Sequence, residues 1–114
     1  MDAQPGSKLV LEIEDQSYEL SAYDAAAGEI LTLGTAGANQ VCCSGPYISR
    51  HHAHIETQRD SFYLVDASSN GTFVQTEDER VHYVHRGRLR LWGKGWIALG
   101  EPLQARRPIL FCEN

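Results

Sequence analysis

The chain has 114 residues, the length of one ordinary domain, which excludes a multi-domain enzyme. Its net charge of −5 gives no support for general nucleic-acid binding, and no apolar run approaches the roughly 18 residues of a transmembrane helix. The first residues lack the basic segment and long apolar run of a signal peptide, and the three cysteines are an odd number. These features together predict a cytoplasmic domain with reduced thiols.

Acidic residues are concentrated near the start of the chain. Residues 1–30 carry a net charge of −6, whereas residues 31–114 carry +1. We expect the acidic part to be a solvated hairpin. The remaining part can present a local basic surface to an anion.

Short apolar or alternating runs follow one another along the chain, and turn residues separate them every eight to twelve positions. Alternation is typical of strands with one buried face, and no run shows a convincing apolar stripe at helical spacing. The expected strands are 9–14, 17–22, 30–33, 40–43, 53–57, 62–65, 72–74, 81–84, 89–91, 96–99 and 109–111. Eleven short strands with frequent turns predict an all-β, antiparallel sandwich or barrel.

The sequence is expected to form one domain, because it contains no internal repeat and no interior linker. Its polar start includes Pro5-Gly6-Ser7, so we expect residues 1–8 to be a flexible N-terminal segment. The domain itself is expected over residues 9–111, followed by a C-terminal tail at 112–114.

Two segments carry polar residues that suit a binding site. Residues 47–55 read Tyr-Ile-Ser-Arg-His-His-Ala-His-Ile, and residues 64–74 contain Asn70-Gly71. Asn-Gly alone is typical of a type I′ hairpin turn, because both residues tolerate positive φ. Ser49-Arg50 alone is an ordinary polar loop. Their order along one chain is more informative than either motif alone.

Four motifs in this order resemble the forkhead-associated (FHA) domain, a phosphothreonine-peptide-binding module. The family carries Gly-Arg after an early strand, then Ser-x-x-His, then Asn-Gly, then a closing Gly-Asp-x-Ile-x-Leu-Gly. The matching segments here are residues 33–34, 49–52, 66–74 and 95–100. The resemblance covers about residues 9–111. It implies an eleven-stranded antiparallel β-sandwich of the FHA/SMAD type, with the peptide site in loops at one end.

The resemblance also implies a role for each matching polar residue. A phosphate group is a compact dianion, and hydroxyl, guanidinium or backbone N–H donors must converge on it. In the family, the positions of Ser49 and Arg50 face the phosphate. The position of Ser69 lies beside the phosphothreonine, and that of Asn70 hydrogen-bonds the peptide backbone.

Four further residues are expected to shape this site. Gly34 closes the first motif, and Gly71 is the turn residue that aims the preceding asparagine. His52 matches the family histidine that braces the loop, with its ring donating to a carbonyl and accepting from a hydroxyl. Asp66 is expected to fix the following turn by accepting backbone N–H groups.

One departure from the family concerns the phosphate itself. Thr35 replaces the arginine that usually anchors the phosphate after the first glycine. Losing such a charge-assisted contact costs about 1.5–3 kcal/mol, or about one to two decades in affinity. Thr35 is therefore a candidate site residue that weakens phosphate binding, and Arg50 is the one cation that the motifs place in the pocket.

The leading interpretation is a phosphothreonine-dependent binding module in signalling. Its expected partner is a phosphothreonine-containing protein or peptide, with no nucleic-acid partner, no membrane partner and no cofactor. The departure at Thr35 leaves an alternative open, a phospho-independent interaction or oligomerisation domain on the same fold. A third interpretation is the regulatory domain of a larger enzyme, because bacterial FHA domains often sit beside kinases.

Metal binding and catalysis are not expected. Cys42 and Cys43, with the histidines at 51, 52 and 54, lack the paired spacing of a zinc site. The sequence has no nucleophile elbow, phosphate-cradling loop or dinucleotide fingerprint, so we do not expect an enzyme. Arg86, Arg88 and Arg90 alternate with other residues, and we expect them to share the solvated face of one strand.

Overall fold

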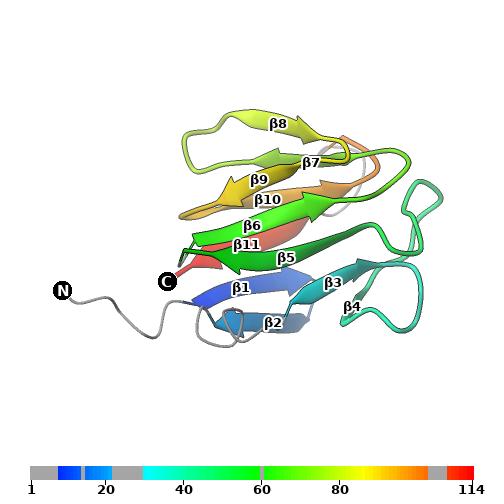
Figure 1. Cartoon of the computed structure of the whole chain (residues 1–114), viewed down its shortest axis with the longest axis horizontal. Coiled ribbons are helices and arrows are strands. Elements are labelled where there is room, and N and C mark those ends of the chain that lie inside the picture. The colour runs from blue at the N-terminus through cyan, green and yellow to red at the C-terminus, as the bar shows by residue number, and fades with distance from the viewer. Residues whose placement is uncertain (1–7, 14, 22–29, 60, 103–107) are drawn as a thin grey trace.

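Eleven strands and no helix make up the described part of this computed structural model, which covers residues 8–13, 15–21, 30–59, 61–102 and 108–114 (Figure 1). Each strand coincides with one expected run, which confirms the all-β prediction. No helix in these ranges is long and apolar enough to cross a membrane. The strands are β1 (Lys8–Ile13), β2 (Gln16–Ser21), β3 (Leu31–Gly34), β4 (Val41–Cys42), β5 (Ala53–Gln58), β6 (Ser61–Asp66), β7 (Thr72–Gln75), β8 (Val81–Val84), β9 (Arg88–Leu91), β10 (Lys94–Leu99) and β11 (Ile109–Glu113).

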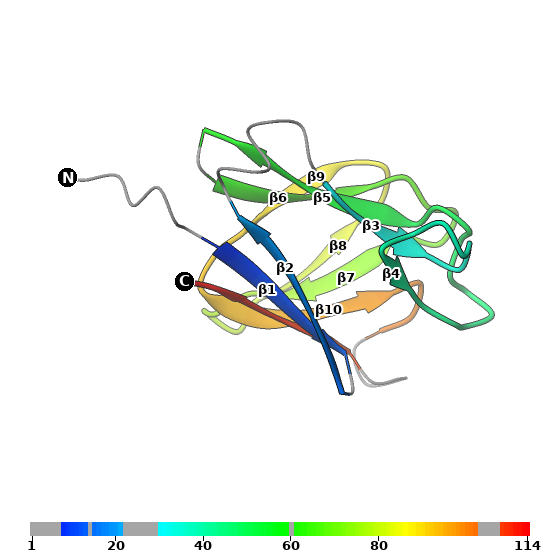
Figure 2. The ribbon, with the colours of Figure 1, turned by 90° about the horizontal axis from the view of Figure 1, so that it is seen from below.

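The strands form two sheets, and Figure 2 shows these as the layers of a sandwich. The six-stranded sheet has the order β2-β1-β11-β10-β7-β8, and the five-stranded sheet has the order β4-β3-β5-β6-β9. Consecutive strands β6 and β7 therefore belong to different sheets, as do β8 and β9. The connections between them cross from one layer to the other.

The core lies between the two sheets. Successive side chains of a strand point to opposite faces, so every second residue meets the opposing sheet. Phe62 and Leu64 on β6 are fully buried and alternate with partly exposed neighbours, and Leu9 and Leu11 on β1 are fully buried from the other side. This packed interior gives the loops at the strand ends a rigid support.

The expected antiparallel sandwich contains one parallel pair of strands. Strands β3 and β4 run parallel, with Leu33 opposite Val41. The turn at residues 35–40 brings the chain back to the level of Thr32, where the backbone N–H of Gln40 donates to the Thr32 hydroxyl over 3.1 Å. Strand β4 then leaves in the same direction as β3, and every other pair is antiparallel.

Regular structure extends beyond the expected limits of 9–111 at both ends. Strand β1 begins at Lys8, and β11 continues to Glu113, so residues 112 and 113 do not form a tail. They are ordered because β1 and β11 pair, with Leu9 opposite Glu113. The rest of the expected flexible segment, residues 1–7, lies outside the described residues, as do residues 22–29.

Replacing Phe62 by alanine tests the packing between the sheets. Because Phe62 is fully buried, Phe62→Ala should lower the free energy of unfolding by about 3–5 kcal/mol. Trp96→Ala is the control, since Trp96 is 40% exposed and should cost less. Chemical denaturation measures both, and equal losses would contradict the proposed location of the core.

Candidate functional site

Four connections gather at one end of the sandwich, which is the right-hand end in Figures 1 and 2. They are residues 35–40 after β3, 43–52 after β4, 67–71 after β6 and 85–87 after β8. The strand registers place the last two connections at the end of the sandwich where β5 begins. The expected site residues all belong to these connections or to the strand ends beside them.

The first two connections are joined through their backbones. The N–H of Thr35 donates to the Ser49 carbonyl over 3.0 Å, and the N–H of Ala36 donates to the Arg50 carbonyl over 3.1 Å. The Asn39 side-chain amide donates to the same Arg50 carbonyl over 2.8 Å. A Cβ at Gly34 would overlap this carbonyl oxygen, so the approach of the two chains requires glycine.

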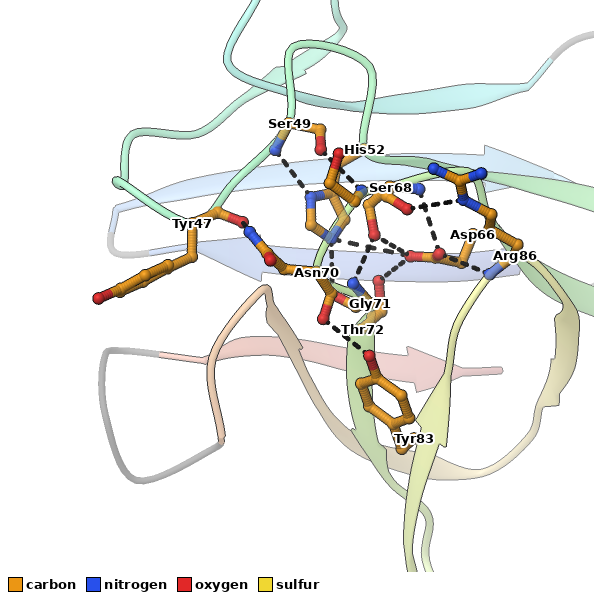
Figure 3. A network of polar contacts seen from close by, with 11 residues as sticks. Tyr47, Ser49, His52, Asp66, Ser68, Asn70, Gly71, Thr72, Tyr83 and Arg86 are labelled. Atoms are coloured by element: carbon orange, nitrogen blue, oxygen red, sulfur yellow. Dashed lines mark hydrogen bonds and ion pairs between the residues drawn. The ribbon is translucent and has the colours of Figure 1, made fainter.

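His52 is fully buried and links two of the connections (Figure 3). Its Nδ1 accepts from the backbone N–H of Ser49 over 3.0 Å, and its Nε2 lies 2.8 Å from the Gly71 carbonyl. These partners require a neutral ring that carries its proton on Nε2. Burial lowers the pKa of His52, which the hydrogen bond to Gly71 and the charge of Asp66 only partly offset. The ring therefore accepts from an N–H group rather than from the expected hydroxyl.

Asp66, at the end of β6, is the second buried polar centre. Its Oδ1 accepts from the hydroxyls of Ser68 (2.8 Å) and Thr72 (2.6 Å), and its Oδ2 accepts from the backbone N–H groups of Ser68 (3.1 Å) and Arg86 (2.8 Å). Burial alone raises the pKa of this carboxyl, but the hydrogen bonds outweigh burial and hold it below its usual range. One ionised carboxylate thus fixes the 67–71 connection and the start of β7.

Ser49, Ser69 and Asn70 lie on the two connections that these buried groups hold. The N–H of Ser69 donates to the Ser49 hydroxyl oxygen over 3.1 Å, which leaves the hydroxyl hydrogen to donate elsewhere. The Asn70 side-chain amide donates to the Tyr47 carbonyl over 3.0 Å. The structure therefore brings these three predicted residues together, with Ser69 and Asn70 exposed and Ser49 half-buried.

The expectation of a type I′ hairpin at Asn70-Gly71 is wrong. Strands β6 and β7 lie in different sheets, so residues 67–71 form a crossing connection and not a hairpin. Gly71 has a φ of 87°, but Asn70 is not among the residues with positive φ. Tyr83, which the sequence interpretation missed, packs where a Gly71 side chain would lie and donates to the Asn70 carbonyl over 3.0 Å.

A protein-family comparison identifies this arrangement. The model of the FHA domain matches residues 31–91, which is more than half of the chain and includes the Ser-x-x-His and Asn-Gly motifs.

This chain belongs to the FHA domain family.

Solved structures share the fold over almost the whole chain. The FHA-1 domain of Mycobacterium tuberculosis Rv1747 has a TM-score of 0.72 at 18% identity, covering 96% of this chain and 98% of that one. The MEK1 FHA domain, solved with a phosphothreonine peptide of HOP1, has a TM-score of 0.67 at 20% identity, covering 93% and 96%. The FhaA FHA domain, complexed with the intracellular domain of Rv3910, has a TM-score of 0.62 at 20% identity, covering 95% and 99%. A search of curated protein sequences gives no match.

Two arginines of this FHA domain lie beside the site. Arg50 is exposed at the 43–52 connection, next to Ser49. The sequence interpretation placed Arg86 on a strand, but β9 begins only at Arg88, and Arg86 lies in the 85–87 connection with a φ of 56°. Its Nε donates to the Ser68 carbonyl over 3.2 Å. Because the arginines alternate with other residues, the sequence did not indicate the turn at residues 85–87. Gly87 is a turn residue that could have indicated it.

The buried state of His52 predicts how stability depends on pH. The unfolded chain takes up a proton at this histidine as the pH falls through about 6.5, whereas burial disfavours that proton in the folded domain. The free energy of unfolding should therefore decrease between about pH 7.5 and 5.5, above the range of ordinary carboxylates.

Denaturant titration at each pH measures this slope. His52→Gln should have a shallower slope than the wild type, and His51→Gln, at an exposed position, should keep the wild-type slope. A wild-type slope in His52→Gln would contradict the neutral assignment of the ring.

Proposed function

We propose that this FHA domain is a phosphothreonine-dependent module that binds a partner protein or peptide in signalling. The observation that carries the proposal is the contact between Ser49 and Ser69, beside Arg50, on connections held by buried His52 and Asp66. A hydroxyl and a guanidinium on a rigid support suit a phosphate dianion.

We assign each residue of the site a role in this proposal. The Ser49 hydroxyl and the Arg50 guanidinium bind the phosphate, and Ser69 lies beside the phosphothreonine. The Asn70 amide binds the peptide backbone, because an amide offers both a donor and an acceptor. Thr35 lies next to the phosphate without a charge. The residues Gly34, His52, Asp66 and Gly71 hold the connections in place.

Two related structures support this assignment. The MEK1 FHA domain was solved with a phosphothreonine peptide of HOP1, and the FhaA FHA domain with the intracellular domain of Rv3910. Both share their fold with this chain, and both were solved as complexes, one with a peptide and one with a protein domain. A peptide or protein partner is accordingly the class of ligand that we assign here.

The substitution at Thr35 favours a second candidate function. Without the family arginine, phosphate affinity is reduced by about one to two decades. On this alternative the same loops bind an unmodified protein, or a second copy of the domain, and the chain acts as an interaction or regulatory part of a larger protein.

A paired peptide titration distinguishes the two candidates. One degenerate peptide library is synthesised with threonine and with phosphothreonine at its central position, and binding is measured by fluorescence anisotropy. Phosphothreonine peptides should bind at least about tenfold more tightly, as expected for one charge-assisted contact. Equal binding of both forms, or binding of neither, would argue against the proposal.

Two adjacent substitutions test the assignment of the phosphate contact. Arg50→Ala should weaken binding of the selected phosphothreonine peptide by about tenfold or more, because it removes a charged donor. His51→Ala is the matched control at the neighbouring exposed position and should weaken it less. Equal effects in the same anisotropy assay would count against the role given to Arg50.

A further inference from the structure

Two hydrogen bonds to Asp66 fix the backbone around Arg86. Its own backbone N–H donates to the Asp66 carboxylate over 2.8 Å, and the backbone N–H of Asp66 donates to the Gly87 carbonyl over 2.8 Å. These two hydrogen bonds attach the 85–87 connection to the end of β6. The backbone from which the Arg86 side chain starts is therefore held against the site.

The side chain of Arg86 reaches the peptide group that also contacts Ser49. Its Nε donates to the carbonyl of Ser68, and the N–H of the same Ser68–Ser69 peptide bond donates to the Ser49 hydroxyl oxygen. Arg86 and Ser49 thus bind the two edges of one peptide group. Figure 3 shows the Arg86 guanidinium turned away from Asp66 and lying beside the Ser68 carbonyl, with Ser49 across the connection from it.

The charge of Arg86 has no acidic partner among the described residues. Arg80 and Arg88, by contrast, lie 3.7 Å and 3.3 Å from carboxylate oxygens of Asp78 and Glu56. A guanidinium has five N–H donors, and only the one on Nε is engaged within the part of the chain that is described. Arg86 is exposed, so its terminal amino groups are accessible to a ligand.

We propose that Arg86 is a second phosphate-binding cation, which replaces the family arginine missing at Thr35. This inference rests on the proposed function. A phosphate monoester carries up to two negative charges and three acceptor oxygens, more than Arg50 and the Ser49 hydroxyl match alone. Anchoring Nε on the Ser68 carbonyl restricts the guanidinium before the ligand arrives, which lowers the entropy lost on binding.

Arg86→Gln tests this role, because glutamine removes the charge but keeps an N–H donor for the Ser68 carbonyl. The probe is the phosphothreonine peptide selected from the library, compared with its threonine form by fluorescence anisotropy. Arg86→Gln should weaken binding of the phosphothreonine form by about tenfold and leave the threonine form unchanged.

Two further variants make the result interpretable. Arg90→Gln is the matched control, because Arg90 is an exposed arginine on β9 and the substitution changes the net charge equally. It should bind like the wild type. Arg86→Gly is the second test variant, since glycine adopts a φ of 56° without strain, so the fold should be kept while the side chain is lost.

The outcomes separate this inference from the proposed function. A wild type that prefers the phosphothreonine peptide, with that preference reduced in both Arg86 variants but not in Arg90→Gln, supports the inference. Unchanged preference in the Arg86 variants overturns the inference and leaves the proposed function standing. Equal weakening of both peptide forms also overturns it, because it shows only loop support. A wild type with no preference overturns both.

Discussion

The candidate site depends on one buried imidazole. His52 has no access to water, so both of its ring nitrogens need partners within the protein. One partner is the backbone N–H of Ser49, just before β5 of the five-stranded sheet, and the other is the carbonyl of Gly71, just before β7 of the six-stranded sheet. A single neutral ring therefore fixes the distance between loops that belong to different layers. A proton added to this ring would turn its acceptor Nδ1 into a donor facing another donor.

The fold was predictable because strands with one buried face alternate apolar and polar residues along the sequence. Each of the eleven expected runs is a strand, including the short β4. The direction of β4 and the ends of β1 and β11 were not predictable in the same way. They depend on hydrogen bonds between residues distant in sequence, such as Leu9 and Glu113, for which a local pattern carries no information. Alternation identifies the strands, but their partners are decided by the whole chain.

Local sequence patterns also do not reveal the contacts between distant residues in the candidate site. The order of the motifs led to Ser49, Ser69 and Asn70, and the structure brings these residues together. Asn70-Gly71 was misassigned as a hairpin, because local turn chemistry cannot tell which sheet the next strand joins. The contacts of Tyr83 and Arg86 with this connection were not predicted, because each side chain donates to a carbonyl of residues 67–71 that only the tertiary structure brings beside it.

Arg86 has a positive φ, although glycine adopts this conformation more readily than arginine. A non-glycine residue in the left-handed region costs of the order of 1 kcal/mol, and glycine at this position would avoid that cost. Positive φ alone does not mark a function, because Arg59 and Glu79 share it elsewhere in the domain. Arg86 differs from them in what its backbone and side chain contact: its N–H donates to buried Asp66 and its Nε donates to the carbonyl before Ser69. The same residue thus helps to hold a buried negative charge behind the loop and carries a positive charge at its surface. For a dianionic ligand, that positive charge also offsets repulsion from the Asp66 carboxylate.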